Sequence, residues 1–202
     1  MTEATGASDD GSARPAPGPG RLRDERSPDA LVREVMTARG DRIRFRPIRP
    51  TDGVGLVAFH NGLSDRSVYR RFFFVHPVLS APEIEHFTHV DYTGRLALVA
   101  EHRDGIVAVG RYERTPGTSE AEVAFVVSDD YQHQGIGAVL LEQLVDAALA
   151  QGITVFTAQT LAENRAMLAM FDKSGFPVTT TRESETVSVR FPIVPTAHQA
   201  PG

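Results

Sequence analysis

The chain has 202 residues, of which 41% are hydrophobic, a formal net charge of −5 and no cysteine. This length fits one ordinary domain with tails, and the lack of cysteine excludes disulfides, thiolate metal sites and a cysteine nucleophile. The negative charge argues against nucleic acid as the main partner, because phosphates favour basic surfaces. No apolar run approaches the ~20 residues that span a bilayer, and the first residues lack the apolar core of a secretory signal. We therefore expect a soluble cytoplasmic protein with neither a nucleic-acid nor a membrane partner.

Both ends of the chain are expected to be disordered tails. Residues 1–31 are rich in Gly, Pro, Ala, Ser and charged residues, and such a segment cannot bury enough apolar surface to offset its ordering entropy. Residues 195–202 have a similar composition. The folded domain is therefore expected to cover residues 32–194.

The first half of this domain predicts one strand followed by three helices. Residues 43–48 alternate like a half-buried strand, and residues 52–62 have a helical pattern. A short helix follows Ser64, a suitable N-cap. Another follows Ser80, where Glu83 stands at capping-box spacing.

The run YRRFFF, residues 69–74, is the most aromatic part of the chain. We interpret it as an amphipathic helix that packs its aromatic side chains on a sheet and leaves Arg70 and Arg71 in solvent.

The second half alternates strands with helices. Two strand-like runs, 95–102 and 105–114, are separated by a turn at Asp104-Gly105. The strand expected at 121–127 leads into a loop and a long apolar helix, and the strand at 153–160 leads into a helix closed by Gly175. A last alternating strand is expected at 186–193. The pattern predicts an α/β (α+β) domain with a single mixed sheet and helices on both faces.

The sequence YQHQGIG, residues 131–137, precedes the long apolar helix. A glycine-rich loop between a strand and a helix can hold an anion, because the first helical N–H groups have no partner within the helix and the helix dipole favours negative charge. A tight turn that binds nothing is the alternative. The loop lacks the third glycine of a dinucleotide-binding fingerprint and the Gly-Lys-Ser/Thr of a P-loop.

Gln132-x-x-Gly135-x-Gly137 resembles the coenzyme A motif Q/R-x-x-G-x-G/A of the GCN5-related N-acetyltransferases. Residues 43–52, 121–127 and 162–176 resemble the first strand, the fourth strand and the late Asn-rich helix of this family. The resemblance implies the family's fold, in which the sheet splays apart at its centre, here between 121–127 and 153–160. It also implies acetyl-CoA as cosubstrate and no metal.

The resemblance also implies site residues. Main-chain groups of Val126 and Val127 would hold the pantetheine arm, and Asn164 would contact it, although a helix N-cap is an equal explanation for Asn164. The loop and the first helical turn would hold the diphosphate through Gln132, His133, Gln134, Gly135, Ile136, Gly137, Ala138 and Val139. Glu122 matches the family's glutamate base, and Glu120 is the second candidate.

The tyrosine that serves this family as general acid is replaced by Phe171. Tyr131 and Ser174 are possible substitutes. The departure leaves the protonation of the leaving thiolate unassigned.

Residues 63–101 resemble the acetyltransferase domain of bacterial protein lysine acetyltransferases of the Pat type. This implies a protein lysine acceptor, for example on an acyl-CoA synthetase. A small-molecule amine acceptor and a non-catalytic acyl-CoA sensor are the alternatives, and the chain is expected to be a monomer or a dimer.

Overall fold

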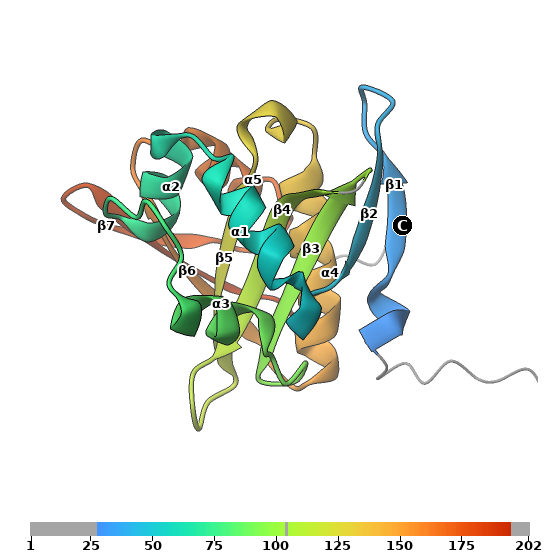
Figure 1. Ribbon diagram of the computed structural model, residues 1–202. Coiled ribbons are helices and arrows are strands. Elements are labelled where there is room, and N and C mark those ends of the chain that lie inside the picture. Colours follow the sequence, from blue (N-terminus) through green and yellow to red (C-terminus); the bar gives the residue numbers. More distant parts are fainter. Residues whose placement is uncertain (1–27, 104, 195–202) are drawn as a thin grey trace, which may run out of the picture.

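The computed structural model of the chain describes residues 28–103 and 105–194. Within these ranges one sheet of eight strands has the order β1-β2-β3-β4-β5-β6-β8-β7 (Figure 1). The strands are β1 (Arg33–Met36), β2 (Arg42–Pro47), β3 (Arg95–His102), β4 (Gly105–Arg114), β5 (Glu120–Val127), β6 (Val155–Leu161), β7 (Thr179–Glu183) and β8 (Thr186–Pro192). The helices are α1 (Gly53–Asn61), α2 (Asp65–Phe72), α3 (Ala81–Thr88), α4 (Ile136–Ala150) and α5 (Arg165–Asp172), with 3-10 turns η1 (Pro28–Leu31), η2 (Pro50–Asp52) and η3 (Asp129–Tyr131).

The sheet is mixed, as the sequence predicts. Within the described ranges β5 and β6 pair in parallel, and every other pair of neighbours is antiparallel. The parallel pair lies near the centre of the strand order. The long helix α4 connects its two strands, as a parallel crossover requires.

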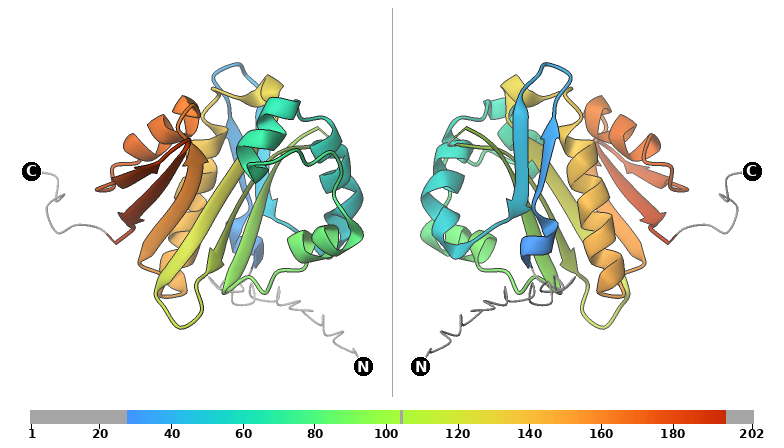
Figure 2. Two further views of the ribbon diagram at one scale, coloured as in Figure 1. Left: turned by 90° about the vertical axis from the view of Figure 1, so that its left-hand side faces the viewer. Right: turned by 90° about the vertical axis from the view of Figure 1, so that its right-hand side faces the viewer.

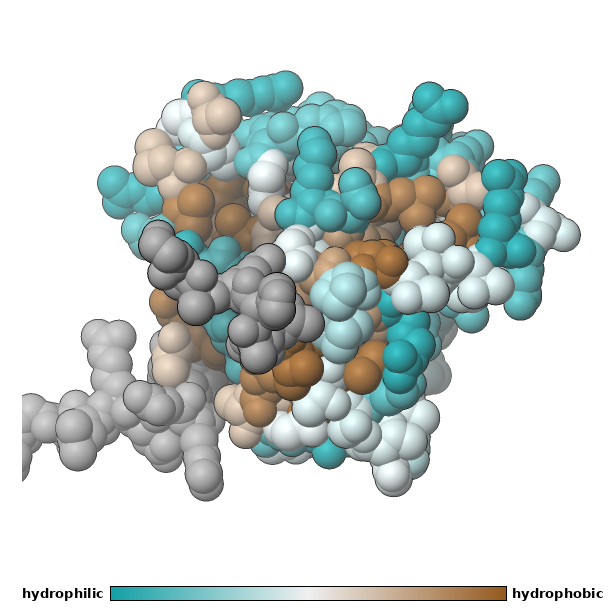
Figure 3. Space-filling model, turned by 180° about the vertical axis from the view of Figure 1, so that it is seen from behind, coloured by the Kyte–Doolittle hydropathy of each residue, from teal (hydrophilic) through white to brown (hydrophobic). Residues whose placement is uncertain are grey.

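Helices cover both faces of the sheet (Figure 2). The larger apolar core lies between the sheet and helices α4 and α5, and a smaller one lies under α1 and α3. Leu96 to Ala100 of β3 belong alternately to the two cores, which explains why this strand is an uninterrupted apolar run. Seen from behind, the molecular surface carries apolar side chains between polar ones (Figure 3).

The predicted helix starts at Ser64 and Ser80 are confirmed. The Ser64 hydroxyl accepts a hydrogen bond from the Ser67 amide. Ser80 forms the full capping box, in which its amide donates to the Glu83 carboxylate at 2.8 Å.

Two strands and one turn differ from the sequence prediction. β1 and β7 are edge strands with exposed side chains on both faces, so neither shows the alternation that identifies a strand. Residues 28–31, assigned to the tail, form η1, and Leu31 packs against the larger core. Residues 1–27 and 195–202, also expected to be tails, lie outside the described residues.

A buried ion pair fixes the start of α1. Asp52 accepts two hydrogen bonds from the Arg46 guanidinium, at 2.7 and 2.9 Å, and Arg46 also donates to Glu101 at 2.5 Å. Burial opposes ionisation of the Asp52 carboxyl, but hydrogen bonds from Arg46 and the Arg49 amide outweigh burial and lower its pKa.

We expect Asp52→Asn to lower the free energy of unfolding by about 3 kcal/mol at pH 7, because it leaves the buried Arg46 with one anionic partner fewer. A lowered folded-state pKa stabilises the fold above the unfolded pKa of about 3.9, and this contribution is lost as the pH falls through the folded-state value. In urea unfolding, the difference in free energy of unfolding between the wild type and Asp52→Asn should therefore become smaller below about pH 4. Asp172 is exposed, so Asp172→Asn is the control. An equal loss of stability in Asp52→Asn and Asp172→Asn would contradict the prediction.

Candidate active site

A cleft opens where β5 and β6 part. Their parallel pairing runs from Glu120↔Val155 to Glu122↔Thr157 and stops there, although β5 continues to Val127. Beyond this point the edge of β5 that faces β6 has no strand partner. Such an edge can pair with an extended ligand through main-chain hydrogen bonds.

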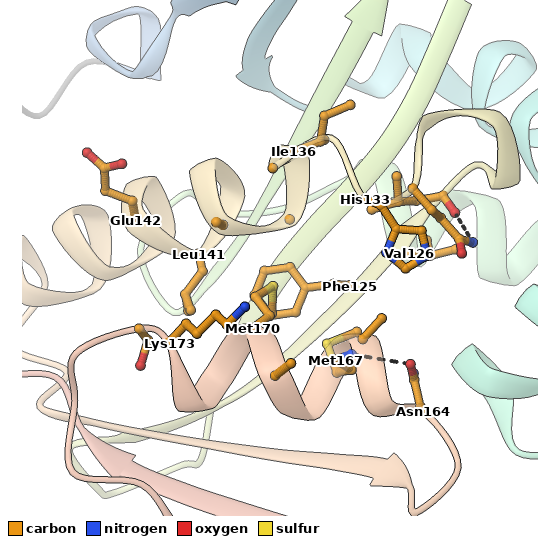
Figure 4. A pocket seen from close by; sticks show the side chains of 18 of the residues that line it. Phe125, Val126, His133, Ile136, Leu141, Glu142, Asn164, Met167, Met170 and Lys173 are labelled. Atoms are coloured by element: carbon orange, nitrogen blue, oxygen red, sulfur yellow. Dashed lines mark hydrogen bonds between the residues drawn. The ribbon is translucent and has the colours of Figure 1, made fainter. Parts of the chain in front are cut away.

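The cleft has a volume of about 720 Å³, which is within the range of small-molecule and cofactor sites. Phe125 of β5 points into the space between α4 and α5, and Met167 and Met170 border it from α5 (Figure 4). Among the lining residues are Ser67, Arg70, Arg71, Val126, Val127, Tyr131, Gln132, His133, Gly135, Ile136, Gly137, Ala138, Leu141, Asn164, Lys173 and Ser174.

The N-terminus of α4 opens into this cleft. Gly135 is its N-cap, with φ of +81°, and it provides no side-chain cap. A Cβ on Gly135 would have no other atom within 4 Å. The amides of Ile136 to Ala138 have no hydrogen-bond partner among the described residues, and these three residues line the cleft, so they can serve as an anion site.

Gly137 has a different role from Gly135. A Cβ on Gly137 would lie 2.9 Å from the Met170 sulfur of α5. A larger residue at this position would have to displace the flexible Met170 side chain. Gly137 leaves room for the Met170 side chain, and both residues line the cleft.

The loop before α4 is tied to α2 by side chains. The side-chain Nε2 of Gln132 donates to the Val127 carbonyl and to the Ser67 hydroxyl, both at 3.1 Å. The Asp129 carboxylate accepts from the Ser64 amide and from the hydroxyls of Ser64 and Ser67. Burial opposes ionisation of Asp129, and these hydrogen bonds outweigh it and lower its pKa. Gln132 thus holds the loop in place, a role that its position in the motif does not reveal.

Nine of the eleven cofactor-binding residues expected from the sequence line the cleft: Val126, Val127, Gln132, His133, Gly135, Ile136, Gly137, Ala138 and Asn164. Gln134 and Val139 lie outside it. The side-chain Nε2 of Gln134 donates to the Asp130 carbonyl. The Val139 N–H donates to the Gly135 carbonyl as the first bond of α4, so it is not available to a ligand, and its inclusion is corrected.

Asn164 is the N-cap of α5, which is one of the two explanations considered for it. Its side chain is buried and caps α5, where the Oδ1 atom accepts from the Met167 amide at 3.3 Å. The residue also lines the cleft. Capping fixes the side chain at this position.

Glu122 occupies the last parallel pair, where the strands part. It is exposed on the face of β5 that carries Val126 and faces α2, and its charge acts on the nearby Arg71 guanidinium. Glu120 instead pairs with Arg190 at 2.5 Å. Of the two candidate bases, Glu122 is therefore the one without an ion pair among the described residues.

Phe171, at the usual position of the acid, is buried in the larger core beside Phe125 and Phe191. The two possible substitutes line the cleft, and both are hydrogen-bonded. The Tyr131 hydroxyl lies 2.5 Å from His102 Nδ1, and the Ser174 hydroxyl donates to the Phe171 carbonyl at 2.6 Å.

The interpretation of Arg70 and Arg71 as solvated residues is wrong. Both are only partly exposed and line the cleft, because α2 lies against β5 and β6. Of the aromatic residues in the run, Tyr69 and Phe74 are exposed, at 40% and 55%, while Phe72 and Phe73 are partly buried.

The described ranges contain no group of three or more His, Asp or Glu side chains that could hold a metal ion. No helix in these ranges is long and apolar enough to cross a membrane.

The chain is similar to known proteins in sequence and in fold. Residues 66–176 match the family model described as the Acetyltransferase (GNAT) family. "Acetyltransferase Pat" of Mycolicibacterium smegmatis is 33% identical over 144 residues, which are 70% of this chain and 43% of that protein. The crystal structure of the GNAT domain of S. lividans PAT is 34% identical, with a TM-score of 0.77, over 82% of this chain and 99% of that domain. The structure of yncA from Salmonella typhimurium with its cofactor acetyl-CoA shares the fold at 18% identity, with a TM-score of 0.61, over 79% of this chain and 98% of that one. The chain thus spans less than half the length of the M. smegmatis protein.

Proposed function

Because the chain belongs to the acetyltransferase (GNAT) family, we propose that it moves an acetyl group directly from acetyl-CoA to a primary amine, with Glu122 as general base. The acceptor that we propose is a lysine side chain of a protein. One observation carries the proposal: the unpaired edge of β5 leads from Glu122 to the open N-terminus of α4. The cleft thus offers a strand edge to an extended thioester and free amides to its diphosphate.

Acetyl-CoA fits the polar groups of this cleft. Main-chain groups of Val126 and Val127 would pair with the pantetheine arm, as an added strand pairs with a sheet edge. The amides at the start of α4, Ile136 to Ala138, would hold the diphosphate. A main-chain N–H of β5 would stabilise the oxyanion that forms on the thioester carbonyl.

Glu122 would remove a proton from the acceptor. An amine with a pKa near 10.4 is only about one part in 2,500 neutral at pH 7, so a base is needed. The amine nitrogen forms a bond to the acetyl carbon, the carbon–sulfur bond breaks, and the amine proton goes to Glu122 directly or through a water. A thiol with a pKa of about 8.5 can leave as the thiolate and take a proton from solvent.

A protein acceptor is favoured by the resemblance of residues 63–101 to Pat-type enzymes and by the match to the M. smegmatis Pat. Since the chain covers 43% of that protein, the properties of the rest of that protein are not carried over. A small amine acceptor, or acyl-CoA sensing without catalysis, would use the same cleft. We place the activity in the cytoplasm and expect a monomer or a dimer, which light scattering can distinguish.

Labelled acetyl-CoA added to a whole-cell lysate with the purified protein tests the proposed acceptor. We expect discrete labelled protein bands, with acetyl-lysine in their peptides. Label confined to small metabolites would favour a small amine acceptor, and binding of acetyl-CoA without any transfer would favour the sensor. Because Lys173 is the single lysine of the chain, side-chain label on the enzyme itself is expected at that residue.

A further inference from the structure

A second, smaller cavity lies on the opposite side of β5 from α4, between the sheet and helices α1 to α3. Its volume is about 30 Å³, enough for two water-sized groups. Arg71 of α2 and Arg111 of β4 line it, surrounded mostly by apolar side chains: Leu56, Phe59, Leu63, Phe72, Leu79, Phe87, Val109, Ala124 and Val126, with His60. Arg71 and Val126 also line the large cleft, so the two cavities meet at these residues.

Within residues 28–103 and 105–194, neither guanidinium group has a carboxylate at ion-pair distance. Arg71 lies over the Phe72 ring at 5.0 Å, and Arg111 lies over the Phe87 ring at 4.3 Å and donates to the Phe87 carbonyl at 3.5 Å. Two cations that line one largely apolar pocket are unfavourable unless an anion compensates them.

The charges around the pair do not supply that anion. Loss of solvation lowers the pKa of both guanidinium groups, and the positive charges of Arg71 and Arg95 lower that of Arg111 further. The charge of Glu122 partly offsets the lowering of the pKa of Arg71, and that of Glu113 does so for Arg111. However, Glu113 also forms an ion pair with Arg95, at 3.7 Å. Glu122 can therefore compensate the positive charge of at most one of the two arginines.

We propose that Arg71 and Arg111 bind a carboxylate of the acceptor, which makes the preferred substrate an amine with a carboxylate close by. The proposal rests on the proposed transfer to an amine. A guanidinium fork matches the two oxygens of a carboxylate, and the cavity has room for two such atoms. The carboxylate belongs either to an Asp or Glu beside the acceptor lysine of a protein or to a free amino acid.

The test compares kcat/KM for matched acceptors. One pair consists of end-blocked peptides with Glu-Lys or Gln-Lys, and the other is 4-aminobutyrate and butylamine. We expect the wild type to prefer the carboxylate member of at least one pair by about 10- to 100-fold, the effect of a hydrogen bond to a charged group. The peptide pair reports an acidic protein segment, and the small pair reports a free amino acid.

In Arg111→Gln, the ratio of kcat/KM between the two members of the pair is expected to fall close to one. Arg66→Gln removes the same charge from an exposed position on α2 and should keep the preference. Arg111→Lys, which retains the charge without the fork, should lower it in part and remains informative if Arg111→Gln does not fold.

Fluorescence anisotropy of the labelled peptides on the enzyme loaded with CoA provides a readout that does not depend on transfer. Tighter binding of the Glu peptide, lost in Arg111→Gln, supports the carboxylate site even if no acetyl group is transferred, in which case the proposed function alone fails. Transfer to amines with equal kcat/KM and equal binding for both members of each pair would overturn the carboxylate site and leave the acetyltransferase assignment intact.

Discussion

Glu122→Gln is expected to lower kcat for amine acetylation by about 10²- to 10⁴-fold, the usual contribution of a general base. The amide keeps the size of the side chain but cannot accept the amine proton. The loss should shrink as the pH rises toward 10, because more of the acceptor is then already neutral. Steady-state kinetics from pH 7 to pH 10 measure both effects.

Two controls separate the loss of a base from general damage. Calorimetry should give the same Kd for acetyl-CoA in Glu122→Gln and the wild type, since Glu122 lies outside the lining of the large cleft. Glu120→Gln, which breaks the exposed pair with Arg190, should keep kcat within about threefold, because exposed ion pairs contribute little. If Glu122→Gln transfers acetyl groups at the wild-type rate to every amine tested, the assignment of Glu122 as base is wrong.

The parts of the fold that the sequence predicts are those whose local chemistry agrees with their final environment. The capping box at Ser80 and Glu83 needs nothing beyond its own four residues. The buried strand β3 is apolar because both of its faces are covered. By contrast, β7 reads TTTRE with every residue exposed, and only its pairing with β8 makes it a strand.

The site shows the same division. The motif predicts a glycine turn before α4, and Gly135 is the N-cap of this helix with a positive φ, which is a local property. The nearest neighbour of Gly137 is not local, since the Met170 sulfur comes from α5. The partner of Gln132, Ser67, is 65 residues away in sequence. The juxtaposition of Arg71 and Arg111 also depends on packing, here of α2 against the sheet, and sequence spacing cannot predict it.

Ala138→Glu is expected to weaken acetyl-CoA binding by about 10- to 100-fold, which corresponds to losing a charge-assisted contact with the diphosphate. Ala138 is exposed, lines the cleft and stands three residues after the N-cap Gly135. A carboxylate at this position would lie near the free amides of α4 and repel the diphosphate. The same carboxylate should stabilise the fold by about 0.5 kcal/mol, because the first turn of α4 has no acidic residue and the helix dipole favours one there.

Two matched variants determine which property of the new side chain matters. Ala138→Gln adds nearly the same volume without the charge and should change the Kd by less than about threefold if repulsion dominates, since surface changes of this kind have small effects. Ala150→Glu adds the same charge at the exposed far end of α4 and should leave the Kd unchanged. In Ala138→Glu alone, the affinity for acetyl-CoA measured by calorimetry should fall while the stability measured by thermal unfolding rises. Misfolding would instead lower both the affinity and the stability. Unchanged binding in Ala138→Glu would show that the diphosphate does not bind to these amides.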